Sequence, residues 1–69
     1  MTAQAAQVLR EAARDIHTNE TFEKALGRAV RTHQGTFEDY MDLVAKVRAR
    51  AKKDGTALRD AAKALATDL

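Results

Sequence analysis

HQGTFEDY, residues 33–40, carries the signal that we interpret as the end of one helix and the start of the next. Glycine readily adopts the left-handed conformation that ends many helices, and threonine is a common N-cap. Gly35 and Thr36 therefore predict a joint between two helices. Asp39 follows Thr36 at the spacing of a capping box with a short acidic arm, which strengthens this prediction.

Two further breaks are predicted on either side of this joint. Gly55 and Thr56 repeat the glycine–threonine pair in KKDGTALRD, residues 52–60. An earlier break is predicted at HTNET, residues 17–21, where three side chains compete as caps. The three competing residues are Thr18, Asn19 and Thr21. The chain has no proline that would interrupt a helix elsewhere.

These breaks predict an all-α fold, because the segments between them carry apolar residues at helical spacing and none alternates as a strand does. We expect a small bundle of three to four short antiparallel helices, since short connections favour antiparallel neighbours. The expected helices span about 3–17, 20–33, 37–53 and 57–67. A chain of 69 residues is expected to form a single helical domain, residues 1–69.

The apolar stripes of these helices predict the core. The stripe residues are Ala5, Val8, Leu9, Ala12 and Ile16 in the first helix, Phe22, Leu26, Ala29 and Val30 in the second, Phe37, Tyr40, Met41, Leu43, Val44, Val47 and Ala51 in the third, and Leu58, Ala62, Leu65 and Leu69 in the fourth. The third helix has the widest stripe, so we expect it to be central, with the other helices packed around it. Gly27, inside the second helix, predicts a close approach by a neighbouring helix.

Composition argues against catalysis. The chain has no cysteine and no serine, which removes disulfides, cysteine-based metal sites and the commonest nucleophiles. His17 and His33 each end a predicted helix, and neither has a carboxylate at metal-ligand spacing. We therefore expect no enzymatic activity, no cofactor and no metal. No apolar run reaches the roughly 20 residues of a membrane helix, so we expect a cytoplasmic protein without membrane contact.

The segment AKVRARAKKDG, residues 45–55, contains the candidate binding residues. Its five basic side chains are Lys46, Arg48, Arg50, Lys52 and Lys53. On a helical wheel they lie on both flanks of the apolar stripe, so they do not form one dense face. Cations near a helix C-terminus are favourable in themselves, and Asp42 stands four residues before Lys46 in the stabilising order. An anionic partner is the alternative interpretation, because Lys and Arg on one surface bind phosphates through counterion release.

Three functional hypotheses follow. The first is a non-enzymatic helical interaction module, an adaptor, regulator or accessory subunit, that buries an apolar helix face against a protein partner or against itself as a dimer. Few large apolar residues are available to close the core within one copy, which favours association. The second is a nucleic-acid-associated protein that uses the basic end of the 37–53 helix. The third is a subunit of a larger enzyme assembly.

Overall fold

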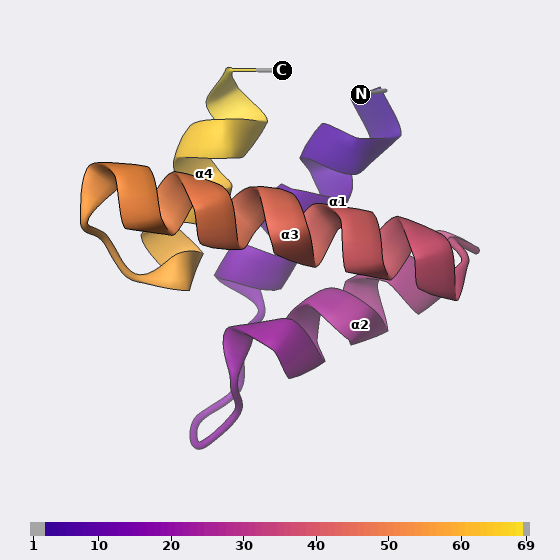
Figure 1. Cartoon of the computed structure of the whole chain (residues 1–69). Helices are drawn as coiled ribbons and strands as arrows, with labels where there is room; N and C mark the ends of the chain where they lie inside the picture. The colour runs from indigo at the N-terminus through magenta and orange to yellow at the C-terminus, as the bar shows by residue number, and fades with distance from the viewer. Residues whose placement is uncertain (1–2, 69) are drawn as a thin grey trace.

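The computed structural model describes residues 3–68, which form four α-helices and no strand (Figure 1). The helices are α1 (Ala3–Arg14), α2 (Phe22–Thr32), α3 (Phe37–Asp54) and α4 (Leu58–Thr67). The predicted all-α fold is confirmed, and the observed helix boundaries lie within three residues of the predicted ones. Leu69, predicted in the last stripe, lies outside the described residues. Among residues 3–68, no helix combines the length and apolar character that crossing a membrane requires.

The centre of the packing is shared by α1 and α4. Helix α1 packs extensively against α2 and α4, and α4 packs to a similar extent against α1 and α3, whereas α3 meets α2 only lightly. The prediction that the 37–53 helix is central is therefore wrong. The buried side chains of α1 are Ala6, Val8, Leu9, Ala12 and Ala13. Three of these five are alanine, and small side chains allow helix axes to approach closely, so one short helix can serve two neighbours.

The wide apolar arc of α3 is only partly buried. Leu43, Val44 and Val47 enter the core together with Ala51, whereas Phe37 and Met41 are exposed. The prediction that Phe37 and Met41 belong to the core is wrong. Met41 stands two residues before Leu43, about 200° around the helix axis, so the two side chains cannot face the same neighbours.

The capping signals are confirmed in part. Thr36 Oγ1 accepts a hydrogen bond from the Asp39 amide at 3.1 Å, and Asp39 Oδ2 accepts one from the Thr36 amide at 2.8 Å. This is the predicted capping box. Gly55 ends α3 in the left-handed conformation, with a φ of 66°. The predicted cap at Thr56 is wrong, because the N-cap of α4 is Ala57, which supplies no side-chain hydrogen bond.

The joint between α2 and α3 uses its glycine differently from the prediction. The left-handed residue is Gln34, with a φ of 60°, and not Gly35. The Gln34 amide donates to the Arg31 carbonyl at 3.0 Å, and the Gly35 amide donates to the Val30 carbonyl at 2.8 Å, which together form a Schellman motif. Gly35 is required for another reason. A Cβ on this residue would lie 2.7 Å from Val30 Cγ1.

Separate substitutions of Gln34 and Gly35 are expected to change the free energy of unfolding in opposite directions. Gln34→Gly should raise the free energy of unfolding by about 1 kcal/mol, because glycine tolerates a positive φ that strains other residues. Gly35→Ala should lower the free energy of unfolding, because the added methyl group meets Val30. Urea denaturation of both variants measures the two changes. Equal effects of the same sign would contradict this account of the joint.

Gly27→Ala, within α2, is the matched control for Gly35→Ala. A Cβ there would lie 3.6 Å from Cε1 of the Tyr40 ring on α3, which is an ordinary van der Waals contact. The neighbour that approaches Gly27 is therefore a side chain that leaves room for a methyl group. Gly27→Ala should raise the free energy of unfolding by about 1 kcal/mol through helix propensity alone.

Candidate functional site: the outward face of α3

Three of the five predicted basic residues pair with carboxylates on the chain itself, and the first two are Lys46 and Arg48. Lys46 Nζ lies 2.8 Å from Asp42 Oδ2, which is the predicted contact between residues four apart. Arg48 Nη2 lies 3.4 Å from Glu23 Oε2, which links α3 to α2. Both pairs are largely exposed, so each adds little to stability. They nevertheless leave less positive charge for an external ligand.

A third predicted residue, Arg50, makes the most complete set of contacts. Its Nε lies 2.6 Å from Asp54 Oδ2 in the last turn of α3, and its Nη1 lies 2.6 Å from Asp68 Oδ2 beyond the end of α4. The hydrogen bonds that it donates to Asp68 and Asp54 raise the pKa of the Arg50 guanidinium above its usual value. This guanidinium therefore joins the ends of two helices.

The remaining two predicted residues, Lys52 and Lys53, are exposed. Neither forms an ion pair within residues 3–68. The structure therefore separates the basic cluster into three side chains with carboxylate partners and two adjacent lysines at the C-terminal end of α3. Carboxylates therefore offset the charge of three of the five residues.

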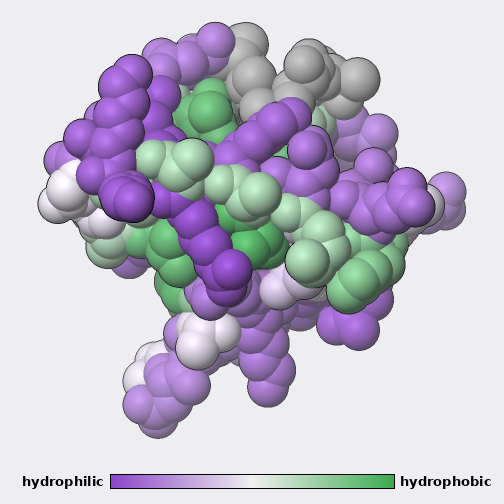
Figure 2. Space-filling view, in the orientation of Figure 1, coloured by the Kyte–Doolittle hydropathy of each residue, from purple (hydrophilic) through white to green (hydrophobic). Residues whose placement is uncertain are grey.

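The solvent-exposed side of α3 carries an apolar stripe. Phe37 is 74% exposed and Met41 is 50% exposed, and Ala45 and Ala49 are also exposed. These four residues recur every four positions and form what we name the outward stripe. In Figure 2, green surface runs along α3 with purple, hydrophilic surface beside it. The charged residues Glu38 and Lys52 share this face of the helical wheel.

The rest of the chain holds the outward stripe in a fixed position. Leu43 and Val47 anchor the opposite side of α3 in the core. The capping box fixes the first turn, where the Phe37 and Tyr40 ring centroids lie 6.0 Å apart. Gly55 ends the helix. The stripe is therefore presented by a helix held at both ends, which limits the conformational entropy lost on binding.

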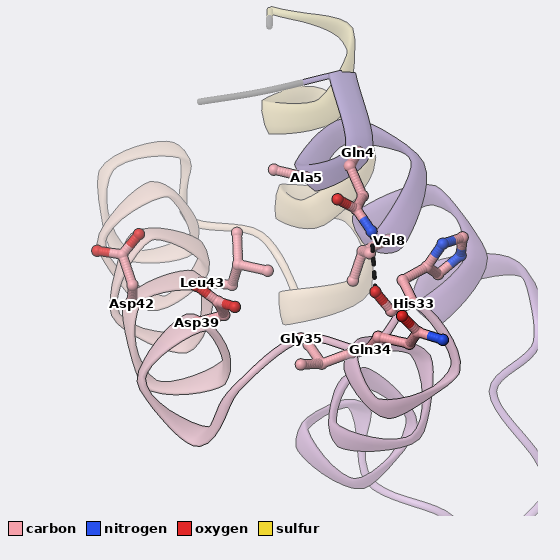
Figure 3. Close-up of a pocket in the computed structure, with 10 residues that line it drawn as sticks. Gln4, Ala5, Val8, His33, Gln34, Gly35, Asp39, Asp42 and Leu43 are labelled. Atoms are coloured by element: carbon pink, nitrogen blue, oxygen red, sulfur yellow. Dashed lines mark hydrogen bonds between the residues drawn. The ribbon is translucent and has the colours of Figure 1, made fainter.

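A cleft of about 390 Å³ adjoins the outward stripe between α2 and the start of α3. Phe37 and Tyr40 line it from α3, and Gly27 and Val30 line it from α2. A second cleft, of about 380 Å³, lies between the start of α1, the end of α2 and α3 (Figure 3).

Most of the polar side chains around the second cleft already have partners. Gln4 Nε2 donates to the His33 carbonyl at 2.9 Å across the cleft (Figure 3). The carboxylates of Asp39 and Asp42 are used by the capping box and by Lys46. Within residues 3–68, no group of three or more histidine and acidic residues could hold a metal ion. Neither the histidines nor the carboxylates converge on this cleft as free ligands.

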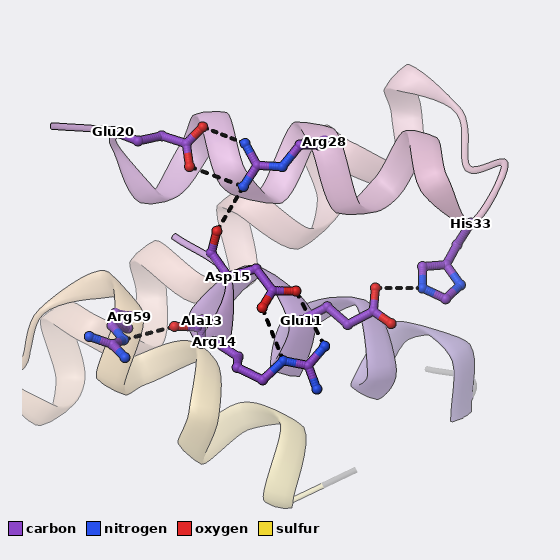
Figure 4. Close-up of polar contacts among 8 residues, drawn as sticks. All are labelled: Glu11, Ala13, Arg14, Asp15, Glu20, Arg28, His33 and Arg59. Carbon is purple, nitrogen blue, oxygen red and sulfur yellow. Dashed lines mark hydrogen bonds and ion pairs between the residues drawn. The ribbon is translucent and has the colours of Figure 1, made fainter. Parts of the chain in front are cut away.

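A network of polar contacts fastens the loop between α1 and α2 (Figure 4). Arg28 Nη2 donates to Glu20 Oε1 at 3.1 Å and to the Asp15 carbonyl at 2.8 Å, and Arg28 Nη1 donates to Glu20 Oε2. The His17 amide also donates to Glu20 Oε1 at 2.9 Å. Hydrogen bonds from Arg28 and then from His17 lower the pKa of Glu20 from 4.5 to about 2. Glu20 therefore holds the loop to α2.

Two more contacts of the network join helices that are distant in sequence (Figure 4). His33 Nε2 lies 2.7 Å from Glu11 Oε2, so the C-cap residue of α2 is tied to α1. Arg59 Nε donates to the Ala13 carbonyl at 2.8 Å and so ties α4 to the end of α1. His33 is half-buried at a helix end, as predicted, whereas His17 lies in the loop after α1. Each of these contacts stabilises the packing.

The Glu20 contacts predict a fall in stability at acidic pH. The unfolded chain takes up the proton near pH 4.5, whereas the folded carboxylate stays ionised down to about pH 2. Protons therefore favour the unfolded chain between these values, and this contribution to stability is lost as the pH falls through them. Thermal melts from pH 5 to pH 2 should show a shallower pH dependence for Glu20→Gln than for the wild type. Parallel curves for the two proteins would contradict the assigned contacts.

Comparisons with protein-family models, with curated proteins and with solved structures find no match to this chain. The chain's own surface is therefore the basis for assigning a function. On that surface, the outward stripe combines large exposed apolar side chains with flanking charge. The clefts and the polar network offer no comparable set of free groups.

Sequence reasoning missed the outward stripe because it assigned Phe37 and Met41 to the core. A usable signal was present, since Phe37, Met41, Ala45 and Ala49 form a second series at a spacing of four beside the series that includes Leu43 and Val47. A helix that carries two apolar series has more apolar surface than two neighbours can cover. One series is then left exposed.

Proposed function

We propose that the protein is a non-enzymatic helical interaction module that binds a protein partner through the outward stripe of α3. The observation that carries this proposal is the exposure of Phe37 and Met41, at 74% and 50%, on one face of an anchored helix. Aromatic and methionine side chains are enriched in the cores of protein interfaces. Large apolar side chains that line up on an exposed face mark interaction sites more often than isolated ones do.

The flanking charges fit the same proposal. Protein interfaces commonly have an apolar centre and a polar, hydrated rim. Glu38 lies at the start of α3, and Lys52 and Lys53 lie at its end, so the stripe has charge at both ends. Such charges steer association and set orientation more than they add affinity.

The nucleic-acid alternative has less support, because three of the five candidate cations have carboxylate partners. Phosphate binding would depend mainly on Lys52 and Lys53. That alternative predicts steeply salt-dependent binding to generic duplex, weakened by Lys52→Glu combined with Lys53→Glu.

Photo-cross-linking in living cells tests the proposal without assuming a partner. A photoreactive phenylalanine analogue at position 41 should give covalent adducts with protein, either other copies of this chain or a different protein. The same analogue at Lys63, which is exposed on α4, is the matched control. If position 41 gives no more protein adducts than position 63, the proposed function is wrong.

A further inference from the structure

We infer that the outward stripe of α3 pairs with the same stripe of a second copy, with the two helices antiparallel about a two-fold axis near Ala45. This inference rests on the proposed function and names the partner. Three features of α3 support a second copy as the partner: its unpaired charges, the small side chain at its centre, and the symmetric placement of its apolar residues.

The unpaired charges lie at opposite ends of α3 and have opposite signs. Glu38, Lys52 and Lys53 are exposed, and none forms an ion pair within residues 3–68. Glu38 and Lys53 are separated by about 22 Å along the helix, too far to meet within one copy. By contrast, the nearby charges of Asp42 and Lys46 meet at 2.8 Å.

An antiparallel second copy brings these separated charges together. Reversing one helix about Ala45 places Glu38 of each copy beside Lys53 of the other, because both side chains project to the same side of the helical wheel. Two complementary pairs form per dimer. A parallel arrangement would instead place Glu38 beside Glu38 and Lys53 beside Lys53, which is repulsive. Charge therefore selects the antiparallel arrangement.

The apolar positions have the same symmetry. Met41 and Ala49 stand four residues before and after Ala45, so each methionine packs against the alanine of the other copy. Ala45 lies at the axis, where its small side chain allows the two helices to approach closely. Phe37 of one copy lies near Lys52 of the other, whose aliphatic stem can cover the ring. Large and small side chains therefore alternate across the contact.

The size of the surface predicts a weak dimer. The 18 residues of α3 span about 27 Å, and a single helix face of this length is small beside the roughly 800 Å² per partner of a standard interface. We expect a reversible monomer–dimer equilibrium with a dissociation constant on the order of 100 μM. Assemblies of this strength respond readily to local concentration.

Sedimentation equilibrium of the purified full chain, from about 10 μM to about 1 mM, tests the inference. Ala45→Glu places two carboxylates at the axis and should weaken dimerisation at least about tenfold. Lys63→Glu introduces the same acidic side chain at an exposed position of α4. This control should leave dimerisation unaltered. A protein that stays monomeric throughout, or a dimer insensitive to Ala45→Glu, would overturn the inference.

Charge reversal tests the orientation. Glu38→Lys and Lys53→Glu should each weaken the dimer roughly fivefold, and the two changes combined in one chain should restore wild-type association. Failure of the combined variant to recover would rule out the antiparallel arrangement. The proposed function is tested separately. If the purified chain is monomeric but position 41 still cross-links to a different protein in cells, the inferred dimer is wrong and the proposed function stands.

Discussion

Leu9→Ala is expected to lower the free energy of unfolding by about 3 kcal/mol. Leu9 has no exposed surface, and it lies on α1, the helix that packs against both α2 and α4. Removing its side chain leaves a cavity at the centre of the packing, and the neighbouring helices close only part of it. A domain of this size has about 3–5 kcal/mol of stability, so the variant should be close to unfolding at room temperature. Circular dichroism during urea denaturation measures the loss.

Phe37→Ala is the matched control for Leu9→Ala. It removes a larger side chain, but that side chain is 74% exposed on the outward stripe. At concentrations well below dimerisation, its free energy of unfolding should stay within about 0.5 kcal/mol of the wild type. The reverse ranking, with Phe37→Ala more damaging than Leu9→Ala, would contradict the burial of Leu9 and the exposure of Phe37.

Ala62→Leu is expected to lower the free energy of unfolding by about 2 kcal/mol, although leucine is the more hydrophobic residue. Ala61 and Ala62 have no exposed surface on α4, and this helix packs against α1 and α3. The added atoms have no space unless the helices move apart, and that movement removes contacts along the whole length of α4. A thermal melt should show a midpoint lower by roughly 10 °C.

Ala49→Leu makes the same chemical change at an exposed position of α3. Its melting midpoint should stay near that of the wild type at micromolar concentration. If Ala62→Leu melted at or above the wild-type temperature, α4 would not pack closely against its neighbours through its alanine residues.

The helices were predictable because their ends are marked by local chemistry. Thr36, Asp39 and Gly55 act within a few residues of their own positions, so the sequence contains the whole signal. The misassigned caps show the limit of this reasoning. Whether Gly35 or Gln34 takes the left-handed conformation depends on the space beside Val30, and that space is a property of the folded chain.

The packing order was not predictable in the same way. Large apolar residues suggested a central α3, but the position of a helix also depends on how closely its neighbours approach. Ala12 and Ala13 on α1 allow that approach, and their small side chains gave no strong signal in the sequence. The same effect explains why the exposure of the outward stripe was not predicted. Phe37 and Met41 resemble core residues until the buried series that includes Leu43 is known.

The most direct test of pairing through the outward stripe is the concentration dependence of the backbone amide signals in ¹H–¹⁵N NMR spectra. Dilution from about 1 mM to about 10 μM should shift the signals of Met41, Ala45 and Ala49 and leave those of Leu9 and Ala13 unchanged. Spectra that do not change with concentration, or shifts that fall on α1 and not on α3, would contradict the inferred pairing of two copies through the outward stripe.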